Sequence, residues 1–126
     1  MAAGQVSVRQ DFTLDHAPAS ATQATISKAA VAGMVWHCTA ILLTFAAAGT
    51  AAAPIAWTLR DGASGAGTVL LSGTLSAVIN TTAVVALSGL DIEGTVNTAM
   101  TLEFAGAGAT ATLQNVNLMG YGEQVG

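Results

Sequence analysis

The sequence predicts an all-β protein: a single β-sandwich or jelly-roll-like domain of about seven to eight strands, with an extended N-terminal arm. Three observations predict this class. Short apolar segments alternate with polar residues at a period of two, and glycine-rich turns separate them. Outside the alanine tracts, no window of eleven residues keeps the 3.6-residue period of a helix. The length of 126 residues suits one domain.

The arm is expected over residues 1–21 and the β-sandwich domain over residues 22–126. Strands are expected at 24–28, 35–45, 55–60, 68–72, 83–87, 100–104 and 112–118, with turns at 61–67 and 106–108. The segment 35–45 is apolar at both parities, which predicts a central strand covered on both faces. Gly73 and Gly120 are expected to end the strands that precede them. Residues 27–34 form the best helical candidate.

The composition indicates a thin core and favours self-association. Hydrophobic residues make up 52% of the chain, but much of this is alanine, and aromatic residues are only 5%. Alanine buries little area per residue. Cys38 is the single cysteine, so a disulfide within the chain is excluded. Association with further copies is the remaining way to bury more surface, and we expect an oligomer.

Charge and hydropathy exclude two classes of partner. With a net charge of -4 and three basic residues, the chain lacks the cationic surface that nucleic acid requires. No charge lies between Lys28 and Arg60, but the strongly apolar part, 40–48, is about half the length of a membrane span. No basic stretch followed by an apolar segment opens the chain, so we expect synthesis in a cytoplasm without a Sec signal.

No constellation of residues predicts catalysis, and we expect a protein that is not an enzyme. His16, His37 and several serines are present, but the Gly-x-Ser-x-Gly elbow is not. His37 lies in the most apolar segment, which favours a hydrogen-bonded core or interface histidine. Cys38 follows it directly, so on a strand the two side chains point to opposite faces. We interpret Cys38 as a buried structural cysteine.

Metal and cofactor sites are not expected either. One cysteine and two histidines do not make a structural zinc site. Asp61, Asp91, Glu93 and Glu103 are too scattered for a calcium loop, so we interpret them as a solvated surface.

Aromatic side chains can stack on sugars or fill a core. For Trp36 and Trp57 we favour the core, because an alanine-rich interior needs bulky side chains at its centre. For Tyr121 both interpretations stay open.

The N-terminal arm is the candidate docking segment. Val6, Val8, Phe12 and Leu14 alternate with polar residues, and Pro18 then breaks the pattern. An extended, alternating segment of this kind suits strand addition to a neighbouring subunit.

Three stretches together carry a resemblance to a known class of proteins. They are Leu59–Gly62 followed by Gly67–Leu75 (LRDG and GTVLLSGTL), Ser88–Phe104 (SGLDIEGTVNTAMTLEF) and Asn115–Tyr121 (NVNLMGY). In their pattern of strands and turns, residues 24–121 resemble small Ala/Gly/Thr-rich β-sandwich virion proteins of tailed bacteriophages, of the capsid decoration (cement) type. The arm has no counterpart in this resemblance.

The resemblance implies a sandwich or jelly-roll body, a homotrimer, and a place on the capsid exterior bound to the major capsid protein. We therefore predict a capsid decoration protein without a cofactor. The alternatives are a phage tail or head fibre module that binds a receptor, and a non-viral carbohydrate-binding β module.

Overall fold

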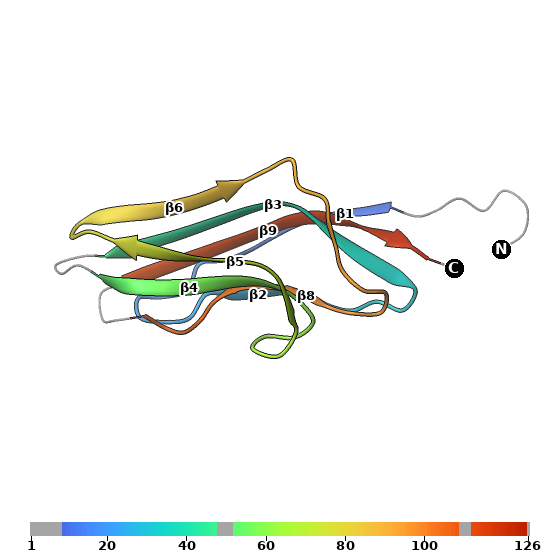
Figure 1. The fold of residues 1–126 in the computed structure, drawn as a ribbon, viewed down its shortest axis with the longest axis horizontal. Coiled ribbons are helices and arrows are strands. Elements are labelled where there is room, and N and C mark those ends of the chain that lie inside the picture. Colours follow the sequence, from blue (N-terminus) through green and yellow to red (C-terminus); the bar gives the residue numbers. More distant parts are fainter. Residues whose placement is uncertain (1–8, 48–51, 109–111, 126) are drawn as a thin grey trace, which may run out of the picture.

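A computed structural model of the chain describes residues 9–47, 52–108 and 112–125. Every regular element in these residues is a β-strand, and the strands form two antiparallel sheets that face each other (Figure 1). This confirms the predicted all-β sandwich. No helical segment with the length and hydropathy needed to cross a bilayer occurs in the described residues.

The strand order within the sheets is that of a jelly roll. The first sheet has the order β1-β9-β3-β6, with the short β7 beside β3, and the second has the order β2-β8-β4-β5. The bounds are β1 Arg9–His16, β2 Thr25–Lys28, β3 Met34–Ala47, β4 Ala52–Asp61, β5 Thr68–Ala77, β6 Thr81–Leu87, β7 Ile92–Glu93, β8 Met100–Phe104 and β9 Thr112–Gln124. Strands distant in sequence are therefore neighbours in each sheet, as in the double-sheet jelly rolls.

The core lies between the two sheets and is built around a few bulky side chains. The largest fully buried ones are Trp36, Phe45, Phe104, Ile41, Leu43, Leu59, Met100, Leu102, Leu118 and Val116. Phe45 of the first sheet packs on Phe104 of the second, with ring centroids 5.9 Å apart. Trp36 and Trp57 are both buried, which confirms their predicted place in the core.

A β-bulge in β3 explains why that strand is apolar at both parities. The register against β9 shifts between Cys38 and Ala40, so Thr39 is an extra residue. Before the bulge, Trp36 and Cys38 face the core; after it, Ile41 does. The prediction of a central strand covered on both faces holds for Met34–Cys38, where every residue is buried. It was wrong after the bulge, where buried and half-buried residues alternate.

Two glycines that were expected to end strands lie inside them. β5 continues through Gly73 to Ala77, and β9 continues through Gly120 to Gln124. At Gly73, an added Cβ would lie 2.7 Å from Nε1 of Trp57, so the missing side chain makes room for the indole. Glycine inside a strand marks such a close approach as often as it marks a turn.

The boundary between arm and domain differs from the one expected after residue 21. Residues 9–16 form β1, which pairs with β9 from Arg9↔Glu123 to His16↔Val116. Phe12 is buried and meets Trp36 edge-on, with ring centroids 5.7 Å apart, and Leu14 is half-buried. These two candidate docking residues thus belong to the sandwich of their own chain. The other two, Val6 and Val8, lie outside the described residues.

The helical candidate at 27–34 is also not a helix. Its first two residues end β2, and a turn follows in which the backbone N–H of Met34 donates to the carbonyl of Val31 at 3.0 Å. Gly33 has a φ of +79°, a conformation that favours glycine and ends any helical path. The chain then enters β3.

Candidate functional site

A cluster of polar and aromatic side chains surrounds His37 on the outer face of the first sheet. The imidazole of His37 is 7% exposed and stacks on the ring of Tyr121, with centroids 4.5 Å apart and planes at 7°. Nδ1 of His37 lies 2.7 Å from Oδ1 of Asp91, and the hydroxyl of Tyr121 donates to the same oxygen at 3.0 Å. The guanidinium of Arg9 covers the other face of Tyr121, 3.9 Å from the ring centroid. His37 is thus a buried, hydrogen-bonded histidine, as predicted.

The charges in this cluster set the ionisation of Asp91. The hydrogen bond from His37, then that from Tyr121, holds the pKa of the Asp91 carboxyl below its ordinary value, although this side chain is exposed. Burial and the neighbouring Asp91 carboxylate raise the pKa of Tyr121. Asp91 therefore stays ionised at neutral pH and ties the 88–97 segment to β3 and β9.

Replacement of Asp91 by asparagine is expected to lower the melting temperature by an amount that depends on pH. Because the folded-state pKa of Asp91 is lowered, its stabilising contribution is present above the unfolded-state value and is lost as pH falls through the folded-state value. The difference in melting temperature between wild type and Asp91→Asn should be constant above about pH 5 and shrink below about pH 4. Thermal melts across this range measure it. In a Tyr121→Phe background, which keeps the contact between His37 and Asp91, Asp91→Asn should retain the larger part of its effect on the melting temperature. A difference in melting temperature that grows towards acid pH contradicts the lowered pKa of Asp91.

The aromatic rings leave little support for a sugar-stacking platform. Trp36 and Trp57 are buried, and Tyr121 is held between His37 and Arg9. Recognition of a sugar by stacking needs an aromatic face open to solvent. Of the two interpretations of Tyr121, the structure favours the role of a packed ring in the outer cluster.

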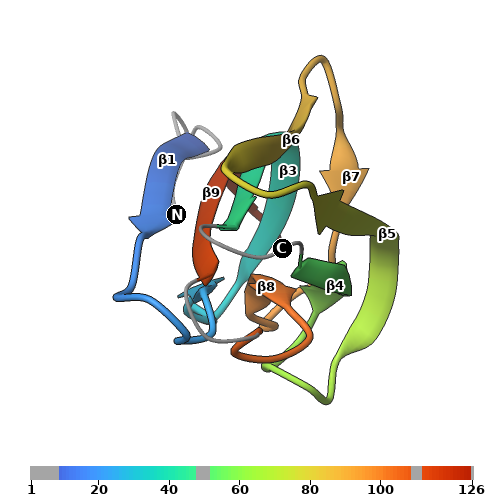
Figure 2. The ribbon, with the colours of Figure 1, turned by 90° about the vertical axis from the view of Figure 1, so that its left-hand side faces the viewer.

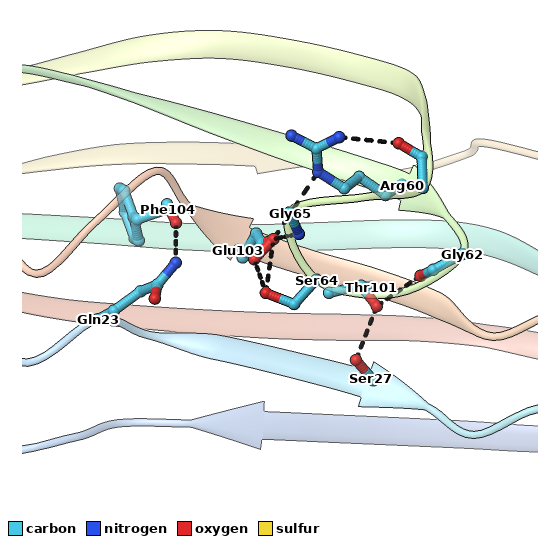
Figure 3. A network of polar contacts seen from close by, with 10 residues as sticks. Gln23, Ser27, Arg60, Gly62, Ser64, Gly65, Thr101, Glu103 and Phe104 are labelled. Carbon is cyan, nitrogen blue, oxygen red and sulfur yellow. Dashed lines mark hydrogen bonds and ion pairs between the residues drawn. The ribbon is translucent and has the colours of Figure 1, made fainter.

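A second polar cluster lies on the outer side of the second sheet, beneath the loop between β4 and β5 (Figure 3). Glu103 of β8 is 3% exposed, and its carboxylate accepts from the hydroxyl of Ser64 and, at 3.0 Å, from the backbone N–H of Gly65. Nε of Arg60 lies 3.8 Å from the carboxylate, while Nη1 of Arg60 donates to the carbonyl of Gly67 at 2.8 Å. The expectation of a solvated surface was therefore wrong for Glu103.

This buried network fixes the loop that covers the sheet. The hydroxyl of Thr101 donates to the carbonyl of Gly62 at 2.8 Å and shares a second hydrogen bond with the hydroxyl of Ser27, so both outward side chains of β8 hold neighbouring segments. The hollow of about 290 Å³ beside Glu103 is lined by Gln23, Thr58, Arg60, Ser64, Gly65, Glu103, Phe104 and Ala105. Its charged groups are paired with each other or with the loop, which is the geometry of a structural anchor.

The remaining candidate groups have structural roles. Asp61 accepts from the backbone N–H and the hydroxyl of Thr95, at 3.0 and 2.5 Å, and so ties the end of β4 to the segment after β7. Burial raises the pKa of the Cys38 thiol to about 11, so it is protonated and unreactive at neutral pH. No group of three His, Cys, Asp or Glu side chains suited to a metal occurs within residues 9–47, 52–108 and 112–125.

A long segment on one side of the sandwich carries no charge. No charged residue occurs from Gly62 through Leu90, and this segment forms β5, β6 and the turn between them. We refer to residues 68–87 as the uncharged side. Five of the nine large apolar side chains that are exposed in the described residues belong to it: Val69, Val78, Ile79, Val84 and Leu87. On the opposite side of the molecule, β1 and β2 carry Arg9, Asp11, Asp15 and Lys28 (Figure 2).

Sequence reasoning missed this side because each of its strands looks ordinary by itself. The absence of charge from residue 62 to residue 90 was visible in the sequence. What the sequence did not show is that the segment supplies an edge strand to both sheets. An uncharged central strand is common, since it is covered on both sides; two uncharged edge strands together are unusual.

Several solved structures are similar to this chain at low sequence identity. A CBM4 structure is 16% identical with a TM-score of 0.45, over 78% of this chain and 60% of that chain. The tobacco streak virus coat protein is 16% identical with a TM-score of 0.34, over 98% and 86%. A protein of Bacillus endospore appendages, described as disulfide-linked pili, is 17% identical with a TM-score of 0.28, over 94% of each chain.

The strand order of the two sheets defines the class of the protein as a β-sandwich of jelly-roll order. The chain spans 60% of the CBM4 protein. No protein-family model matches the sequence, and no curated protein matches it. A fold of this kind is by itself compatible with a structural or a binding role, so the surface must decide between them.

Proposed function

We propose that the chain is a structural protein of a virus particle: a capsid decoration (cement) protein that binds the outside of a tailed-phage head and stabilises it. Its partner is the major capsid protein. The observation that carries this proposal is the uncharged side, residues 68–87. The resemblance of residues 24–121 to phage virion proteins supports the same assignment.

The uncharged side has the physical properties of a protein-binding surface. Val78 at the β5–β6 turn is 70% exposed, and Ile79 follows it. Apolar side chains gathered at one turn and two strand edges gain free energy when a protein surface covers them. Because no charge lies among them, a neighbour can cover them without desolvating an unpaired ion. Many such copies on one shell would each add a modest stabilising contact.

Attachment to heads tests the proposal. Heads assembled from the major capsid protein encoded in the same genome, but without this chain, are mixed with the purified protein and sedimented. We expect saturable co-sedimentation and heads that resist heating better than bare heads. Val78→Lys places a charge at the centre of the uncharged side and should weaken attachment by at least about tenfold, which is about 1.4 kcal/mol.

The matched control is Val31→Lys. Val31 is also an exposed valine, but it lies in the β2–β3 connection outside the uncharged side. Its replacement should leave attachment unchanged. Failure of the wild-type protein to bind heads at any concentration overturns the proposal, and equal loss in both variants shows that the uncharged side is not the attachment surface.

A further inference from the structure

β6 is a regular edge strand without any of the usual protections. It pairs with β3 without a bulge, from Ile41↔Leu87 to Ala47↔Thr81, and its other edge has no partner strand in the described sheets. It lies along the upper margin of the molecule (Figure 1). Its sequence, TTAVVAL, has no charge and no proline, and most of its side chains are exposed.

Edge strands are normally guarded, because their unpaired backbone N–H and C=O groups can pair with another chain. The guards are charged side chains, prolines, bulges or a covering segment. At the other edge of the same sheet, β1 carries Arg9, Asp11 and Asp15, and at the corresponding edge of the second sheet β2 carries Lys28. β6 has none of these devices, although it is rich in the β-branched residues that favour strand pairing.

We infer that β6 is the self-association edge of this protein, and that its occupant is β6 of a second copy. The inference rests on the proposed role in a virion assembly. Two copies related by a twofold axis pair their β6 strands antiparallel, centred on Val84. The two first sheets then join into one continuous sheet with the order β1-β9-β3-β6 in each half.

The side chains of β6 fit this arrangement. With the axis at Val84, the two Val84 side chains meet on the outer face, and Thr82 lies opposite Ala86 of the partner on the same face. On the inner face, Ala83 lies opposite Val85 of the partner. Cross-strand pairs of β-branched residues stabilise an antiparallel pair, and no pair in this register places like charges together. Val84 is 55% exposed in the single chain, so pairing removes apolar surface from water.

The charge distribution is compatible with a second copy as the occupant of the β6 edge, and it leaves β5 and the β5–β6 turn for the capsid contact. The chain carries a net charge of -4, and every charged residue lies outside residues 62–90. Two copies that pair through β6 bring no charged residue of that strand together, whereas approach through β1 brings Asp11 and Asp15 towards each other. The uncharged edge of β6 in one copy can therefore pair with the uncharged edge of β6 in another copy.

Light scattering after size exclusion, on the full chain, tests the inference. We expect a mass of about twice 12.4 kDa for the wild type. Val84→Lys should give a monomer, because it places two like charges opposite each other at the axis. The control is Leu113→Lys, since Leu113 is 51% exposed on the outer face of β9 in the same sheet but away from the edge. This variant should keep the wild-type mass, and circular dichroism verifies that both variants fold.

A cysteine placed at the axis gives a second, covalent measurement. Directly opposed residues in an antiparallel pair have Cα atoms about 4.5–5.5 Å apart, a separation that a disulfide can bridge. Val84→Cys should therefore form a disulfide-linked dimer under mild oxidation, while Leu113→Cys should not. The native thiol of Cys38 is buried and does not interfere.

The outcomes separate this inference from the proposed function. A wild-type monomer, a trimer of the kind that the resemblance implies, or a dimer that survives Val84→Lys overturns the β6 pairing, whatever the protein does on heads. A dimer that fails to bind heads leaves the pairing in place and removes the decoration role. Head binding by a monomeric protein supports the decoration role and overturns the β6 pairing.

Discussion

Replacement of Glu103 by alanine is expected to lower the free energy of unfolding by about 3 kcal/mol, because it removes a buried carboxylate that two loop groups and the buried Nε of Arg60 depend on. The hydroxyl of Ser64 and the backbone N–H of Gly65 both donate to this carboxylate. The guanidinium of Arg60 loses the negative charge that lies 3.8 Å from its Nε. Among the described residues, Nε of Arg60 has no hydrogen-bond partner, so the carboxylate is its main compensation.

Urea denaturation followed by tryptophan fluorescence measures this effect, since Trp36 and Trp57 are buried in the folded chain. Glu93→Ala is the matched control: Glu93 is exposed on β7, and its removal should change stability by no more than about 0.5 kcal/mol. Glu103→Gln keeps an acceptor in the same place and should lie between the two. If Glu103→Ala and Glu93→Ala are equally stable, the carboxylate does not anchor the loop.

The strands were predictable because period-two alternation reports which side chains a sheet buries. β2, β4 and β8 lie within a few residues of their predicted bounds. The predictions were wrong where backbone geometry that the sequence does not show interrupts the alternation. The bulge at Thr39 changes which parity of β3 faces the core. Gly73 lies against the indole of Trp57 inside β5 and does not form a turn.

The surfaces were harder to predict than the strands, since they depend on which strands become neighbours. Glu103 alternates with Leu102 and Phe104 in a way that indicates a solvated carboxylate, yet a loop from residues 62–67 covers it. In the sequence, Phe12 alternates with polar residues, which is typical of an extended arm. Its burial follows from the pairing of β1 with β9 at the far end of the chain. A pairing over such a sequence separation is set by the whole topology and leaves no local signal.

The same topology gives meaning to the absence of charge between residues 62 and 90. In a central strand, neutrality reflects burial on both sides. In β5 and β6, which are edge strands of the two sheets, neutrality leaves backbone groups and apolar side chains exposed. A protein with such a side gains stability when another protein covers it, and this gain is common to the proposed decoration role and the proposed pairing of β6.

Replacement of Gly120 by alanine is expected to destabilise the sandwich by about 3 kcal/mol or more, because the added methyl group collides with backbone. Gly120 of β9 lies opposite Cys38, beside the bulge of β3. A Cβ at this position would overlap the carbonyl oxygen of His37 and lie 3.0 Å from Cζ of Phe12. A carbonyl in a paired strand cannot rotate away as a side chain can, so the β3–β9 pairing itself must shift.

The comparison variant is Gly106→Ala, in the turn after β8. An added Cβ there has no atom of the described part of the chain within 4 Å, and its φ lies outside the left-handed region, so this variant should match the wild type or gain up to about 1 kcal/mol. Thermal and urea unfolding of the two variants give the difference. The Gly120 variant should also lose the His37–Tyr121 stacking first, since Tyr121 follows the displaced residue in β9 and His37 supplies the obstructing carbonyl. Equal stability of the two variants is incompatible with the close approach of β9 to the bulge, and hence with the geometry that turns His37 outward while Cys38 faces the core.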